Sequence, residues 1–95
     1  MPAYFVVEIE ITDAAAYDRY RPLAAASVER HGGKFLVRGG RTETLEGGWS
    51  PKRVVILEFP GMEAARAFYD SPDYQEALKI RLAASRSKAI LVEGA

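Results

Sequence analysis

The stretch AYFVVEIEI, residues 3–11, decides the fold. Its odd positions are all apolar, and its even positions become acidic towards the end, at Glu8 and Glu10. Side chains of a β-strand alternate between the two faces of a sheet, so this pattern predicts a strand with one strongly apolar face. Runs rich in β-branched and aliphatic residues predict three more strands, over Lys34–Arg38, Val54–Phe59 and Ala89–Val92.

The segment between the first two strands predicts a long helix. Thr12 or Asp13 can cap its start, apolar side chains recur at helical spacing from Tyr17 to Val28, and Gly32-Gly33 ends it. Pro22 lies inside this segment and lacks the amide hydrogen that a helix interior needs. We therefore expect the helix to be kinked or split at this residue.

The remaining segments complete the order βαββαβ. Two shorter helices are predicted over Gly61–Tyr69 and Pro72–Ser85, and Ser71 caps the second of them. Residues 41–51 are too numerous for a tight turn and too polar for core, so they predict a projecting β-arm or loop. The whole chain, residues 1–95, is expected to form one α+β domain: a ferredoxin-like plait with an antiparallel four-stranded sheet and helices on one face.

The sheet face left bare by the helices is also apolar. Strand parity assigns to the helix side Phe5, Val7, Ile9, Phe35, Val37, Val55, Leu57 and Phe59. The other face carries more aliphatic surface than a monomer leaves in water, from Val6, Leu36, Val54, Ile56 and Ile90 or Val92. Its simplest cover is the same face of a second copy, so we predict a homodimeric α+β barrel. The predicted interface comprises Val6, Leu36, Arg38, Trp49, Arg53, Val54 and Ile56.

Charged residues and the arm leave alternatives open at this interface. Arg38 shares the parity of Glu8 and Glu58, so these three side chains form either an enclosed ion cluster or part of the rim. The arm cements the dimer, covers the partner's pocket as a lid, or packs on its own sheet. The arm residues concerned are Trp49, Arg41, Glu43 and Arg53.

Composition and charge argue against several classes of function. The 95 residues include 13 Lys plus Arg, 13 Asp plus Glu and no Cys. This balance argues against nucleic-acid partners and anionic membranes, which need a clustered positive field, and no apolar run approaches the ~20 residues of a membrane span. The lack of Cys and of a signal-like leader predicts a cytoplasmic protein. A single His gives no metal-ligand spacing, and no dinucleotide-binding glycine motif is present, so we expect neither a metal nor a cofactor.

Aromatic residues of the predicted helices are the candidates for a ligand site. They form either ordinary core or the lining of a pocket for a small flat or apolar molecule. The predicted pocket comprises Tyr17, Tyr20, Phe68, Tyr69, Tyr74 and Arg81. Arg81 pairs either with a ligand carboxylate or with Asp73 or Glu76. His31, the single imidazole, is a candidate base at neutral pH, and the alternative is that it caps the helix before Gly32-Gly33.

Several segments resemble one known family. They are GGKFLVRGG at residues 32–40, LEGGWSPKR at 45–53, VILEFP at 55–60, AFYDSPDY at 67–74, and Arg81. In combination they span nearly the whole chain and are similar to domain-of-unknown-function family 1330. The resemblance implies a dimeric α+β barrel of the ferredoxin-like class and no established reaction, so no catalytic set transfers to this sequence.

The sequence is compatible with three functions. The first is a homodimeric domain that binds a small metabolite between helices and sheet. The second is a cofactor-independent monooxygenase or isomerase, reactions found among relatives of this fold, in which His31 or a pocket tyrosine moves protons. The third is a structural or regulatory dimer without catalysis.

Overall fold

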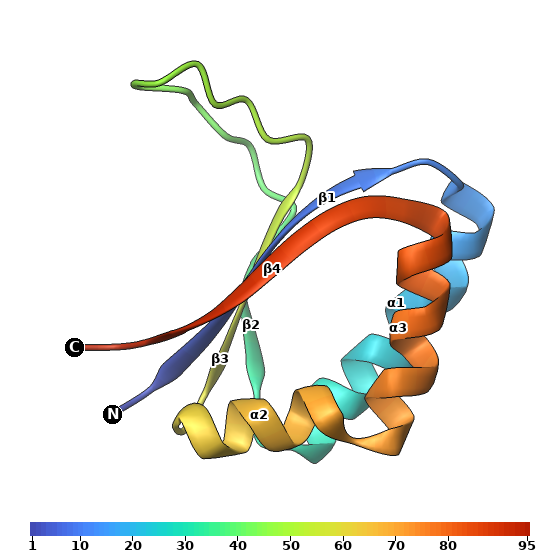
Figure 1. Cartoon of the computed structure of the whole chain (residues 1–95), viewed down its shortest axis with the longest axis vertical. Helices are drawn as coiled ribbons and strands as arrows, with labels where there is room; N and C mark the ends of the chain where they lie inside the picture. The colour runs from blue at the N-terminus through green and yellow to red at the C-terminus, as the bar shows by residue number, and fades with distance from the viewer.

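The computed structural model describes residues 1–95, and its elements follow the predicted order. They are β1 (Ala3–Ile11), α1 (Ala14–Arg30), β2 (Lys34–Arg38), β3 (Val54–Phe59), α2 (Met62–Asp70), α3 (Pro72–Ala84) and β4 (Ser85–Glu93). The strands form one antiparallel sheet in the order β2-β3-β1-β4, and the helices lie on one side of it (Figure 1). The predicted α+β, ferredoxin-like plait is confirmed.

Local signals in the sequence fix the ends of the helices. The side chain of Asp13 accepts a hydrogen bond from the amide of Ala16 (3.1 Å) and caps α1. The hydroxyl of Ser71 accepts from the amide of Tyr74 (3.3 Å), so the residue that follows α2 also starts α3. α1 continues through Pro22 from Ala14 to Arg30, which excludes a split helix. None of the three helices is both long and apolar enough to cross a membrane.

The last strand is longer than the sequence pattern predicts. β4 begins at Ser85, directly after α3, and pairs with β1 from Ile11↔Ser85 to Ala3↔Glu93. Its first half carries Arg86 and Lys88, which are exposed. Because this half is polar, it lacks the apolar run that predicted the second half. Pairing with a long, well-defined neighbour therefore extends β4 beyond its own sequence signal.

The core lies between the sheet and the helices. The helix-facing residues of β1 and β3 are buried as predicted, and they are Phe5, Val7, Ile9, Val55, Leu57 and Phe59. Phe68 of α2 is fully buried against them, with its ring centroid 4.9 Å from that of Phe59 and 4.3 Å from that of Tyr74. This aromatic stack connects β3, α2 and α3, and it fixes the two helices on the sheet.

A β-bulge in β2 changes the predicted faces of two residues. Phe35 pairs with Leu57, but the register shifts at Leu36, so that Val37 pairs with Ile56 and Arg38 with Val55. A one-residue bulge reverses the side-chain alternation, because strand residues have a period of two. The prediction that Arg38 shares the open face with Glu8 and Glu58 is therefore wrong, as is the helix-side placement of Val37.

Candidate functional site

A cavity of about 110 Å³ lies between α1 and the sheet. Its walls come from all three helices and from β1, β2 and β3, and most of the side chains are apolar. The lining residues are Phe5, Val7, Ile9, Tyr17, Tyr20, Arg21, Ala24, Ala25, Val28, Phe35, Arg38, Arg53, Val55, Leu57, Phe68 and Tyr74. The cavity is thus a small, mainly apolar chamber with a few polar groups in its wall.

Two phenol groups form the polar part of its inner wall. The hydroxyls of Tyr20 and Tyr74 lie 2.7 Å apart and share a buried hydrogen bond across α1 and α3. Burial raises the pKa of Tyr20 well above its ordinary value, and the charge and hydrogen bond of Tyr74 raise it further. The Tyr20 hydroxyl therefore stays protonated, and each hydroxyl of the pair can donate or accept a hydrogen bond.

Arg81 lies behind these phenols. It is 2% exposed, its guanidinium carbon lies 6.0 Å from the centroid of the Tyr20 ring, and it donates a hydrogen bond to the hydroxyl of Ser87. Burial acts to lower the pKa of Arg81, but Tyr74 and Tyr20 outweigh this effect, so the pKa is raised and the guanidinium stays charged. No carboxylate forms an ion pair with it, so the predicted alternatives of Asp73 and Glu76 are not its partners.

Three arginines also line the cavity, and the part of the lining that they form is called the cavity mouth below. Arg21 comes from α1, Arg38 from the end of β2, and Arg53 from the residue before β3. Arg21 and Arg38 are exposed, whereas Arg53 is half-buried against Gly39. A Cβ atom at Gly39 would lie 2.0 Å from Nη1 of Arg53, and the φ of 73° at this glycine lies in the left-handed region. Glycine is therefore needed here for the arginine to reach the cavity.

The structure brings together four of the six residues in the predicted pocket. Tyr17, Tyr20, Phe68 and Tyr74 line the cavity, whereas Arg81 does not. Tyr69 lines a separate depression between α2 and β4, beside Arg66 and Ile90. The arginines at the cavity mouth are absent from the predicted pocket: Arg38 and Arg53 were predicted as interface residues, and the bulge that turns Arg38 inward has no clear sequence signal.

His31 does not line the cavity. Its Nδ1 donates a hydrogen bond to the carbonyl oxygen of Ser27, at 2.9 Å. Its backbone N–H also donates to carbonyl oxygens at the end of α1. Its ring centroid lies 6.1 Å from that of Phe68, in an edge-to-face arrangement. This geometry is that of a helix C-cap.

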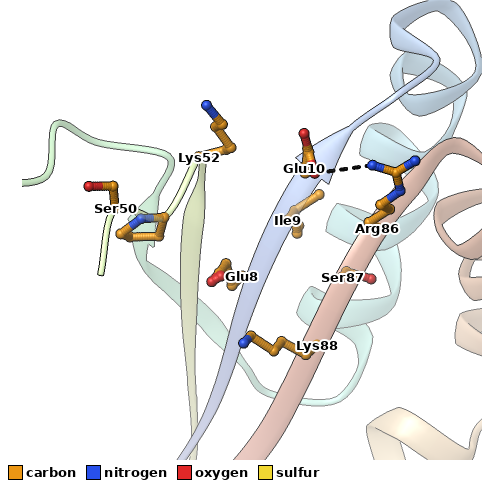
Figure 2. Close-up of a pocket in the computed structure, with 9 residues that line it drawn as sticks. Glu8, Ile9, Glu10, Ser50, Lys52, Arg86, Ser87 and Lys88 are labelled. Carbon is orange, nitrogen blue, oxygen red and sulfur yellow. Dashed lines mark ion pairs between the residues drawn. The ribbon is translucent and has the colours of Figure 1, made fainter. Parts of the chain in front are cut away.

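The open sheet face carries a polar depression beside the arm. The depression, of about 360 Å³, lies where residues 50–52 pass β1 and β4, and it is lined by Glu8, Ile9, Glu10, Ser50, Pro51, Lys52, Arg86, Ser87 and Lys88 (Figure 2). Charges of both signs face one another in it, and Glu10 and Arg86 form an ion pair at 3.8 Å. Such mutually compensated charges do not select a ligand of one sign. No group of three or more His, Cys, Asp or Glu residues has a metal-binding arrangement.

The predicted interface residues divide between the two faces. Val6, Val54 and Ile56 lie on the open face, and Leu36 in the bulge is half exposed. Trp49 belongs to the arm, which projects from the sheet (Figure 1), and its indole Nε1 donates to Oε1 of Glu8 at 3.1 Å. Arg38 and Arg53, by contrast, belong to the cavity.

Comparison with known proteins places the chain in a family. The family model described as a domain of unknown function, DUF1330, matches residues 2–95, and the chain belongs to that family. No curated protein matches.

Several solved structures are similar over nearly the whole chain. RPA0582, a protein of unknown function from Rhodopseudomonas palustris, is 26% identical, with a TM-score of 0.80 over 99% of this chain and 82% of that one. SnoaB, a cofactor-independent oxygenase from Streptomyces nogalater, is 20% identical, with a TM-score of 0.70 over 99% of this chain and 93% of the other. A dimeric ferredoxin-like protein of unknown function from Jannaschia sp. CCS1 is 18% identical, with a TM-score of 0.67 over 99% and 100% of the two chains.

Proposed function

We propose that this member of the DUF1330 family is a homodimeric domain that binds a small molecule in the cavity between α1 and the sheet. The observation that carries the proposal is the chamber itself, where apolar walls surround one hydrogen-bonded pair of phenols. A cavity in an apolar core costs stability that full packing would supply, and this cost fits a binding role for the chamber. The ligand supported by these walls has an apolar, flat body and few polar groups.

The dimer is supported by the apolar surface of the open sheet face. Leu36 is 49% exposed, Ile90 59% and Val92 44%, and Val6 and Ile56 lie between them in the sheet. Contiguous aliphatic surface of this extent is uncommon on a monomer. The structural relative from Jannaschia is described as dimeric, and it has the same fold.

A second function, turnover of the bound molecule without a cofactor, is favoured by the phenol pair. Tyr20 and Tyr74 can pass a proton to or from an oxygen of a bound substrate, whereas His31 lies outside the cavity and is not placed to do so. SnoaB, which has this fold, is a cofactor-independent oxygenase. Turnover that disappears in Tyr20→Phe and Tyr74→Phe, with binding retained, would distinguish an enzyme from a binding protein; a structural dimer would bind nothing in the cavity.

The test of the binding function is to fill the cavity. Ala24 on α1 is 6% exposed and lines the chamber, so Ala24→Leu occupies it, whereas Ala26→Leu adds the same side chain to an exposed position on the same helix. Binding of single-ring aromatic compounds is measured by saturation-transfer NMR, and circular dichroism verifies folding. We expect binding by the natural sequence and by Ala26→Leu but not by Ala24→Leu.

Should Ala24→Leu misfold, Ala25→Leu at the half-buried wall of the same cavity takes its place. Equal binding by the filled and control variants would refute the proposal, as would the absence of binding by every protein.

A further inference from the structure

The charged residues that line the cavity are all of one sign. Arg21, Arg38 and Arg53 line it, and no Asp or Glu is among the lining residues. We infer that the ligand is a small monocyclic carboxylate, whose apolar body enters the cavity and whose carboxylate pairs with Arg38 and Arg53. This inference rests on the proposed binding function and specifies its ligand class.

Arg53 supplies the first line of evidence. Its Nε atom is buried and has no hydrogen-bond partner, and the side chain forms no ion pair within the chain. A buried donor of a charged group without a partner is costly, and an anion bound beside it removes that cost. The close fit of the guanidinium against Gly39 holds it in place before any ligand arrives.

Arg38 supplies the second line of evidence, from a different element. The bulge at Leu36 turns Arg38 towards the helix side, and its guanidinium carbon lies 3.6 Å from the centroid of the Phe35 ring. This stacking orients the planar group but satisfies none of its N–H donors, and Arg38 has no carboxylate partner. Arg21 differs, because Asp18 already pairs with it at 3.1 Å. Two guanidinium groups are thus available, and planar forks of this kind match a carboxylate in bidentate geometry.

The volume of the cavity limits the size of the ligand body. An apolar cavity of about 150 Å³ in another protein accommodates benzene. At about 110 Å³, this chamber is slightly smaller, so it takes one ring or a branched chain of similar size after small adjustments. The polar group cannot share that space, and the arginines lie at the exposed end. The ligand therefore binds with its ring against Tyr17 and Phe68 and its carboxylate at the mouth.

The experiment compares probes that differ only in charge. Benzoate and phenylacetate are titrated against the full chain by NMR and calorimetry at low and moderate salt, together with neutral benzamide and with phenyl phosphate. The variants are Arg38→Gln and Arg53→Gln, and the control is Arg19→Gln, an exposed position on α1 outside the cavity. Each charge-assisted contact is worth about 1.5–3 kcal/mol, which corresponds to roughly 10- to 150-fold in affinity.

We expect benzoate or phenylacetate to bind at least 10-fold more tightly than benzamide. Arg38→Gln and Arg53→Gln should each reduce that affinity roughly 10-fold or more, with benzamide and Arg19→Gln little changed. Benzamide binding as tightly as benzoate would overturn the carboxylate inference but leave the binding function intact. Phenyl phosphate binding more tightly than either acid would also overturn it, as would arginine variants that weaken only dimerisation. If no probe binds, and Ala24→Leu behaves like the natural sequence, both the carboxylate inference and the proposed binding function would be overturned.

Discussion

Replacing Ile90 by Lys tests the proposed dimer against a closely matched control. Ile90 lies on the open sheet face opposite Val6, and Leu82 lies on α3; both are 59% exposed in the single chain. In a monomer the two substitutions should therefore have similar effects. In the proposed dimer only Ile90 is covered, so only Ile90→Lys should change the dissociation constant.

The expected magnitude follows from the exposed fraction. Complete burial of an Ile side chain is worth about 1.5–3 kcal/mol, and 59% of it remains to be buried, which gives roughly 0.9–1.8 kcal/mol per copy. A two-fold interface contains two copies, so the loss is roughly 2–3.5 kcal/mol, or about 20- to 300-fold in the dissociation constant. Desolvation of two lysines adds to this loss.

Sedimentation equilibrium over a range of protein concentrations measures the constant directly. The natural sequence and Leu82→Lys should be dimers at concentrations where Ile90→Lys is a monomer with an unchanged circular dichroism spectrum. Equal dissociation constants for the two variants would refute the covered open face, and so would a natural sequence that is monomeric throughout.

Further expectations concern stability. Tyr20→Phe leaves the hydroxyl of Tyr74 buried without its partner and should lower the free energy of unfolding, measured by urea denaturation, by about 1–3 kcal/mol. The double variant Tyr20→Phe, Tyr74→Phe should lose less free energy of unfolding than the sum of the two single losses. Pro22→Ala should raise the free energy of unfolding by about 1–3 kcal/mol, because Pro22 is exposed within a continuous helix and alanine restores the missing hydrogen bond. An unchanged denaturation midpoint would contradict this expectation. The hydroxyl of Ser27 lowers the pKa of Asp73; burial opposes this effect, whereas Ser71 and the charge of Arg30 add to it, and the resulting pKa is about 2. The stability that Asp73 contributes is therefore complete above pH ~4 and lost as the pH falls towards 2, and Asp73→Asn should show a smaller loss of stability in this range.

Strand periodicity predicted most of the fold because β1 and β3 occupy the centre of the sheet. A central strand buried on one face must alternate, and the six residues predicted to face the helices from these two strands are all buried. The edge strands carry weaker signals. β4 is polar over its first half, and β2 has only five residues, so one bulge reversed the faces of Val37 and Arg38.

The candidate site was predictable to the extent that it depends on helical spacing. Tyr17, Tyr20 and Tyr74 point towards the sheet from regular helices, as the spacing indicates. Tyr69 follows Phe68 directly and is therefore rotated by about 100° around the helix, into a different depression. Arg81 lies two turns beyond Tyr74, about 10 Å along the axis, and so falls outside the cavity.

The two proposed roles use opposite faces of the same sheet, and this separation makes them independently testable. Successive residues of β1 serve different surfaces: Phe5 and Val7 line the cavity, whereas Val6 between them lies on the open face. Every strand residue that lines the cavity has the helix-facing parity, whereas the proposed dimer uses the opposite face. Ile90→Lys should therefore abolish the dimer yet retain ligand affinity within a few-fold. A large loss of affinity in the folded monomer would mean that the partner subunit completes the mouth, and the arm around Trp49 would then be the element to truncate.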